Sequence, residues 1–177
     1  DHSQVSRLYR NRYPGAFEDV TNASKLMMSV NGQGCTSADY DNDGFADLLV
    51  TGWHECLLWH NNGDGTFSDV TVKADVVRGR WNTGACFADF NRDGNLDLFV
   101  AGYLHFDPAS HKPCVSKEIR IGYCGPHHYA ADDDVLLWGT GDGLFQDISE
   151  QAGILLPRGP GFGGVAADVD NDGWPDL

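Results

Sequence analysis

Three short stretches of the chain carry oxygen side chains at the spacing of a calcium loop. The first, DYDNDGFADL, begins at Asp39, and near-copies follow as DFNRDGNLDL from Asp89 and DVDNDGWPDL from Asp168. Positions 1, 3, 5 and 9 of each copy are Asp or Asn, and position 6 is the glycine that a sharp turn around an ion requires. Carboxylates this close repel one another unless a hard cation lies between them. We therefore predict three Ca²⁺ sites.

Each predicted site combines the four side chains with the backbone carbonyl of position 7 and a water, because Ca²⁺ takes about six to eight oxygen ligands. The predicted ligands are Asp39, Asp41, Asp43, Phe45 and Asp47 in the first loop; Asp89, Asn91, Asp93, Asn95 and Asp97 in the second; and Asp168, Asp170, Asp172, Trp174 and Asp176 in the third. Asn91 replaces a carboxylate, so we expect the second loop to lose its ion first.

An EF-hand is the obvious alternative, but it needs flanking helices and a Glu at position 12. That position is Val50 in the first loop and Val100 in the second. Short apolar runs follow position 9 and end at Gly52 and Gly102, which is typical of buried strands. Each loop is therefore predicted to join two strands. A solvated turn is a further alternative. Three copies with the same spacing of Asp, Asn and Gly argue against it.

A second motif repeats in step with the loops. Phe-x-Asp-Val/Ile-Thr/Ser occurs at 17–21, 67–71 and 145–149, and its Asp precedes the first Asp of the next loop by 20, 20 and 21 residues. The first two loops begin 50 residues apart. This period, with short strands, Gly-rich turns and no helical pattern, predicts an all-β fold of four-stranded antiparallel β-propeller blades. Small residues crowd the predicted inner strands, which converge on the propeller axis: Gly34, Ser37, Ala38, Gly84, Ala85, Ala88, Gly163, Gly164, Ala166 and Ala167.

The repeat divides the chain into parts of one propeller. We predict outer strands of one blade in 1–30, a full blade in 31–80, a full blade with an insertion over 104–134 in 81–156, and the start of the next blade in 157–177. The predicted strands of the two full blades are 34–38, 48–52, 56–59 and 65–72, then 84–88, 98–102, 135–138 and 143–149. About two and a half blades cannot close a ring, so we expect the remaining blades from the same protein or a second chain.

The insertion is the longest segment outside the repeat. The second and third loops begin 79 residues apart, which is 29 more than the 50 of the first pair. Cys114 and Cys124 are predicted to form a disulfide that holds the insertion in shape over the neighbouring loops. The other cysteines fall in predicted strands as small buried thiols, with their pairing left open: Cys35, Cys56 and Cys86.

Composition narrows the class of protein. The 177 residues are 41% hydrophobic, enough for one domain or part of a larger one, and the net charge of -14 argues against nucleic acid and anionic membranes as partners. No apolar run has the length of a membrane span, and the start at Asp1 is interpreted as mature or trimmed. Five cysteines and calcium loops favour a secreted protein, extracellular or periplasmic, although cytosolic thiols would give the same count.

Polar and aromatic residues are predicted at the end of the blades opposite the calcium loops: His54, Arg78, Arg80, Trp81, His105, His111, His127, His128 and Arg158. A transition-metal site lacks the usual His-x-Glu or His-x-x-x-His spacing, and solvated histidines are the plainer interpretation. An Arg beside an aromatic ring suits a sugar or a carboxylate, but a Trp that caps the core fits equally well.

The DxDxDGxxDL loops, the NNGDGTFSDVT hairpin and the YCGP turn together resemble the FG-GAP/VCBS repeat proteins of the ASPIC/UnbV type, relatives of the integrin alpha-subunit propeller. The resemblance extends over essentially the whole chain. It implies a seven-bladed propeller with Ca²⁺ between the first two strands of several blades, bound by the loop side chains named above. It says little about activity, because the fold serves adhesion, sugar binding and occasional catalysis.

Two functions are compatible with these motifs. The first is a calcium-stabilised extracellular binding or scaffold module for protein or glycan. The second is a carbohydrate lyase or hydrolase that uses an Arg and a histidine such as His54 or His105. We favour the first, because the strong motifs are all structural and the sequence holds no nucleophile elbow, P-loop or dinucleotide fingerprint.

Overall fold

The computed structural model describes residues 6–76, 79–109, 114–115, 121–122, 124–155 and 159–177. These residues form two four-stranded antiparallel sheets, two two-stranded hairpins and one short 3-10 helix, η1 (Pro126–His128). The predicted all-β class with four-stranded blades is therefore confirmed. The number of blades in the ring stays a prediction.

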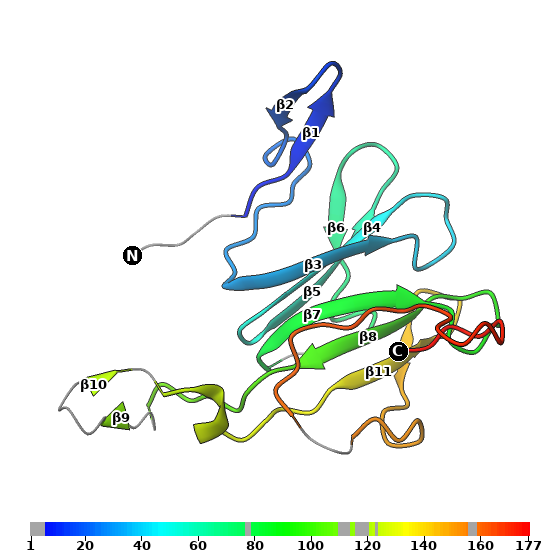
Figure 1. The fold of residues 1–177 in the computed structure, drawn as a ribbon. Helices are drawn as coiled ribbons and strands as arrows, with labels where there is room; N and C mark the ends of the chain where they lie inside the picture. The colour runs from blue at the N-terminus through cyan, green and yellow to red at the C-terminus, as the bar shows by residue number, and fades with distance from the viewer. Residues whose placement is uncertain (1–5, 77–78, 110–113, 116–120, 123, 156–158) are drawn as a thin grey trace.

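Each full blade is one sheet, and the two sheets pack against each other (Figure 1). The first blade consists, in chain order, of β3 (Gly32–Ala38), β4 (Asp47–Gly52), β5 (Glu55–Asn61) and β6 (Phe67–Asp69). The second consists of β7 (Asn82–Ala88), β8 (Asp97–Gly102), β11 (Val135–Gly139) and β12 (Phe145–Asp147). The remaining strands form a hairpin before the first blade and one within the insertion: β1 (Tyr9–Arg12) with β2 (Ala16–Asp19), and β9 (Cys114–Val115) with β10 (Ile121–Gly122).

The inner strands of neighbouring blades approach each other closely. A Cβ atom on Gly34 would collide with the carbonyl oxygen of Thr83 in β7, and one on Gly84 would lie 2.7 Å from the Cα of Gly163. The buried hydroxyl of Thr51 donates to the same Thr83 carbonyl at 2.6 Å, which joins the two blades. The small residues of the inner strands are therefore needed for blade packing, as predicted.

The outer strands are shorter than the predicted ranges 65–72 and 143–149, because β6 ends at Asp69 and β12 at Asp147. The carboxylate of Asp69 accepts the N–H of Thr71 at 3.0 Å, and the Thr71 hydroxyl accepts the N–H of Leu58 at 2.9 Å. Ser149 makes the equivalent pair of bonds in the second blade. A side-chain oxygen thus takes the place of the next ladder bond, so the repeated motif ends the outer strand.

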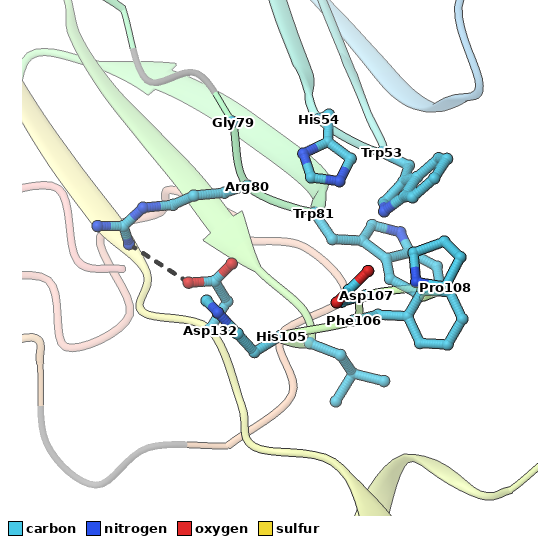
Figure 2. Close-up of a pocket in the computed structure, with 11 residues that line it drawn as sticks. Trp53, His54, Gly79, Arg80, Trp81, His105, Phe106, Asp107, Pro108 and Asp132 are labelled. Atoms are coloured by element: carbon cyan, nitrogen blue, oxygen red, sulfur yellow. Dashed lines mark ion pairs between the residues drawn. The ribbon is translucent and has the colours of Figure 1, made fainter. Parts of the chain in front are cut away.

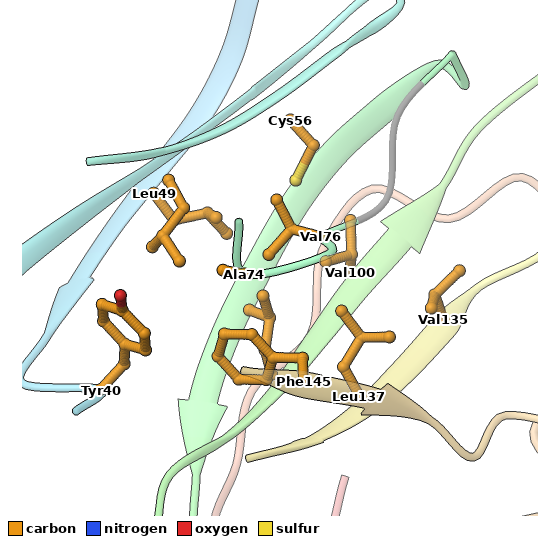
Figure 3. Close-up of a cluster of buried hydrophobic side chains, with 11 residues drawn as sticks. Tyr40, Leu49, Cys56, Ala74, Val76, Val100, Val135, Leu137 and Phe145 are labelled. Carbon is orange, nitrogen blue, oxygen red and sulfur yellow. The ribbon is translucent and has the colours of Figure 1, made fainter. Parts of the chain in front are cut away.

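The main core lies between the two sheets, as Figure 3 shows. It contains Tyr40, Leu49, Cys56, Leu58, Ala74, Val76, Leu98, Val100, Val135, Leu137 and Phe145. The prediction that the three strand cysteines are buried is correct only for Cys56: Cys86 is half-buried, Cys35 is exposed, and all three are free. Cys35 is exposed because it lies on the face of β3 that turns away from this core, where the strand alternates between exposed and half-buried residues.

The third strands of the two blades differ from the predicted alignment by one residue. The predicted ranges 56–59 and 135–138 make Trp59 and Trp138 equivalent, but Trp59 pairs with Asp69, whereas Leu137 pairs with the equivalent Asp147. Trp59 therefore corresponds to Leu137, and Trp138 corresponds to His60. A one-residue shift moves a side chain to the other face of a sheet, which leaves Trp59 9% exposed and Trp138 40% exposed.

Candidate calcium loops and the pocket at the opposite end

The three predicted calcium loops lie at one end of the blades (Figure 1). The first connects β3 to β4, the second connects β7 to β8, and the third spans the bridge between Ala167 and Asp176. Neighbouring loops touch: the Asn42 amide donates to the Gly94 carbonyl at 3.3 Å, and the Arg92 guanidinium lies 5.1 Å from the centroid of the Trp174 ring. The prediction that each loop joins two strands is confirmed for the first and second.

The three loops share one pattern of hydrogen bonds between aspartate carboxylates and backbone N–H groups. In the first, Asp39 accepts the N–H groups of Asp43 and Gly44 at 3.0 and 2.9 Å, and Asp47 accepts the N–H of Tyr40 at 3.2 Å. The same three bonds, between the same positions, occur in the second and third loops. Position 4 has a positive φ of 58° to 63° in all three, and the glycine at position 6 has 88° to 92°. The repeated spacing therefore encodes one backbone conformation.

The carboxylates of positions 1, 3 and 9 converge. Their oxygens lie within 4.8 Å of one another in the first and third loops: Asp39, Asp41 and Asp47, and Asp168, Asp170 and Asp176. A cation about 2.4 Å from each oxygen spans this distance. The Oδ1 atom of Asp41 is buried and has no hydrogen-bond partner within the described part of the chain, as expected of an atom that binds an ion. The residues present therefore fit Ca²⁺.

The second loop differs at position 3, as the sequence indicates. The amide nitrogen of Asn91 donates to Asp93 Oδ2 at 2.9 Å, and its oxygen accepts the Asp93 N–H at 3.0 Å. At position 7 the backbone N–H groups donate to the position 5 carboxylate at 2.8 Å in all three loops, from Phe45, Asn95 and Trp174. Binding of Ca²⁺ by the carbonyls of these three residues stays a prediction.

The aspartates at position 9 have a second role that the sequence does not reveal. Asp47 and Asp97 are almost fully buried, and each accepts a backbone N–H of the third strand of its blade, from Asn61 at 2.8 Å and Gly139 at 3.1 Å. Burial raises the pKa of both carboxyl groups, because a charge is costly away from water. A bound cation would offset that cost, while the hydrogen bonds attach each loop to its sheet.

A pocket of about 220 Å³ lies at the opposite end of the blades, next to the turn between β4 and β5 (Figure 2). Trp53, Trp81 and Phe106 form an aromatic cluster in its lining, with Phe106 6.5 Å from the Trp53 ring and 5.8 Å from the Trp81 ring between centroids. Backbone pairing between Trp53 and Trp81 holds the two blades together at this point. The pocket therefore forms where the blades meet.

The polar groups of the pocket come from both blades and from the insertion. Arg80 donates to the Asp133 carbonyl at 3.1 Å and lies 3.7 Å from Asp132, so its charge is already paired. The indole N–H of Trp81 is buried without a hydrogen-bond partner in the described ranges. The other lining residues are His54, Gly79, Leu104, His105, Asp107 and Pro108.

The structure thus brings together only some of the residues predicted at this end. His54, Arg80, Trp81 and His105 line the pocket. His127 and His128 lie in η1 with their rings 4.1 Å apart and do not line it. The remaining predicted residues, Arg78, His111 and Arg158, lie outside the described residues.

The predicted disulfide between Cys114 and Cys124 is present, with the two Cα atoms 5.2 Å apart. The hairpin that it closes extends away from the two sheets in Figure 1. Residues 104–108 of the insertion line the pocket, and the role of the disulfide in holding the insertion over the neighbouring loops stays a prediction.

Sequence reasoning missed His60, whose ring lies against the first loop. The signal was available in the spacing: His60 precedes Phe67 by seven residues, as Trp138 precedes Phe145. Counting from the outer hairpin, instead of aligning the two Leu-Leu-Trp strings, makes His60 and not Trp59 the counterpart of Trp138.

Four-stranded sheets that pack blade on blade through small inner strands define the β-propeller class of fold. The chain matches the family model of the FG-GAP-like repeat over residues 1–50 and 39–100, which is more than half of its length. It belongs to this family, whose repeats indicate a propeller module for binding or scaffolding. No curated protein matches the chain. Within the described ranges, no helix is long and apolar enough to cross a bilayer.

Proposed function

We propose that this chain is a calcium-stabilised segment of an extracellular β-propeller of the ASPIC/UnbV type that binds protein or glycan at its pocket end. The convergence of the loop carboxylates supports the calcium part. Oxygens of three carboxylates within 4.8 Å of one another, in two separate loops, carry a mutual repulsion that a divalent cation removes. When bound, Ca²⁺ supplies positive charge that holds each loop closed between the first two strands.

The Cys114–Cys124 disulfide supports the extracellular part of the proposal, because disulfides persist in oxidising compartments. The FG-GAP-like repeats agree with this location. The partners include the remaining blades of the ring, which either the same protein or a second chain supplies.

The aromatic pocket supports glycan binding. Aromatic faces pack against the apolar faces of sugar rings, and Trp53, Trp81 and Phe106 all line this pocket. A volume of about 220 Å³ suits a single sugar unit. The lyase or hydrolase alternative has less support, because Arg80 is already paired with Asp132 and the Asp133 carbonyl.

Calorimetry with and without Ca²⁺ tests the calcium part. Since the folded loops bind the ion and the unfolded chain does not, the melting temperature should rise with free Ca²⁺. Asp170→Asn keeps the acceptor for the Asp172 N–H but removes one ligand charge, as Asn91 does in the second loop, so the variant should bind Ca²⁺ more weakly at the third loop. Asp75→Asn is the matched control, since Asp75 is exposed, lies outside the loops and has a φ of 58° that Asn tolerates. An unchanged melting temperature after chelation would refute the calcium part.

A glycan array tests the binding part. Wild-type protein should bind a subset of the sugars, and Trp53→Ala, which removes one aromatic wall, should lose that signal while its calcium titration is unchanged. Equal binding by the wild type and Trp53→Ala would place the glycan elsewhere.

A further inference from the structure

His60 brings a nitrogen ligand to the first loop. Its Nδ1 atom lies 3.2 Å from Asp41 Oδ2 and 3.3 Å from Asp47 Oδ1, and its Nε2 atom lies 3.8 Å from Asp43 Oδ2. One ligand atom from each of His60, Asp41 and Asp43 falls within 4.8 Å of the other two. The imidazole therefore lies against the carboxylates of positions 3, 5 and 9, with Nδ1 next to Asp41 and Asp47 and Nε2 nearer Asp43.

The Nδ1 atom of His60 is free of hydrogen bonds to the described part of the chain. Nδ1 is buried and makes no hydrogen bond to any described residue, although two carboxylate oxygens lie at nearly equal distances from it. Asp41 Oδ1, beside it, is buried and unpartnered among the described residues as well. Buried polar atoms are usually hydrogen-bonded, so two neighbouring ones without a partner, one on the loop and one on β5, are the arrangement expected of groups that bind a common ion.

In the second blade a tryptophan occupies the position equivalent to His60. The strand register makes Trp138 the counterpart of His60, and an indole N–H has no lone pair for a metal. The rest of the second loop repeats the hydrogen-bonding frame of the first. The two sites therefore differ in ligand chemistry through one side chain of the third strand, as well as through Asn91.

We propose that the first loop binds its cation with His60 as a ligand and therefore accepts a borderline divalent cation, of the Mn²⁺ or Co²⁺ type, in preference to Ca²⁺. Nitrogen ligands suit these ions, whereas Ca²⁺ prefers an all-oxygen shell. The inference rests on the proposed function, because it takes the loops to be cation sites. The second and third loops keep oxygen side chains and stay selective for Ca²⁺.

Mn²⁺ is the probe, because it binds in carboxylate sites and its pulsed EPR spectrum detects a directly bound ¹⁴N nucleus. Wild-type protein with one equivalent of Mn²⁺ should show the ¹⁴N modulation of a bound imidazole. In His60→Gln that modulation should vanish and Mn²⁺ affinity should fall about tenfold or more. Mutation of residues that only hydrogen-bond to metal ligands already lowers metal affinity by roughly 10–100-fold. His128→Gln, an exposed histidine of η1, is the matched control and should keep the ¹⁴N signal.

Two results would overturn the inference. If His60→Gln raised the affinities for Mn²⁺ and Ca²⁺ together, His60 would be an internal cation that takes the place of the metal. An absence of ¹⁴N modulation in wild-type protein that binds Mn²⁺ would place His60 outside the ligand shell. Failure of the proposed function is distinguishable, because then Ca²⁺ calorimetry would detect no ion at the third loop either, where His60 plays no part.

Discussion

The two tryptophans of the third strands offer a direct test of the blade register. Both follow two leucines in the sequence, yet Trp59 is 9% exposed and packs with Leu26 and Met28, whereas Trp138 is 40% exposed. The difference of 31% in exposure, applied to the roughly 250 Å² of a Trp side chain, is about 80 Å². At about 25 cal/mol per Å² this corresponds to about 2 kcal/mol.

We expect Trp59→Ala to lower the free energy of unfolding of the 177-residue chain by about 3–5 kcal/mol, the usual cost of emptying a buried aromatic site. Trp138→Ala should cost about 2 kcal/mol less, from the area difference. Urea unfolding followed by far-UV circular dichroism, in the same calcium-containing buffer, measures both. Trp59→Phe is the control that keeps most of the buried ring, and it should recover more than half of the loss.

Equal costs for Trp59→Ala and Trp138→Ala would refute the reasoning. They would mean that the two tryptophans are equivalent and that the third strand of one blade is displaced by a residue from the register described here. His60 would then face away from the first loop, so the same result would also contradict the nitrogen-ligand inference.

Three further predictions concern single groups. Iodoacetamide at about pH 8 should label the exposed Cys35 and spare Cys56, because burial raises the pKa of the Cys56 thiol to about 12; mass mapping reads both. Burial also raises the pKa of Asp134 above 3.8, so the folded state binds its proton more tightly. Relative to Asp134→Asn, wild-type protein should therefore gain stability as the pH falls through the folded-state pKa, and this gain should be complete below 3.8. Urea unfolding of both proteins at pH 7 and at about pH 3.5 measures the gain. Asn91→Asp should bring the calcium affinity of the second loop closer to that of the third, and calorimetric titration with unchanged affinities would contradict this.

Much of the architecture could be predicted because it is encoded in local spacing. The position of each aspartate in DxDxDGxxD follows from the backbone of a single loop, since the carboxylate at position 1 bonds N–H groups only four and five residues ahead. The period of 50 residues and the small residues before each loop indicate blades for the same reason. The Cys114–Cys124 bond, ten residues apart, is also a local feature.

The features that were not predicted depend on which face of a strand meets which neighbour. Aligning the Leu-Leu-Trp strings misplaces one blade by a residue, because pairing with the outer strand, and not the identity of the residues, decides the register. The exposure of Cys35 depends on which side of β3 faces the core. The outer strands end early because a Thr or Ser hydroxyl from the following turn reaches the third strand.

By itself, then, the sequence determined the blade repeat, the backbone of the three acidic loops and the disulfide, all of which depend on residues near one another along the chain. Only the tertiary structure decided what surrounds them. His60 reaches the first loop across the sheet, and the pocket forms where Trp53 of one blade pairs with Trp81 of the next. Contacts between separate strands depend on register and blade packing, and the residues of a single strand do not specify either one.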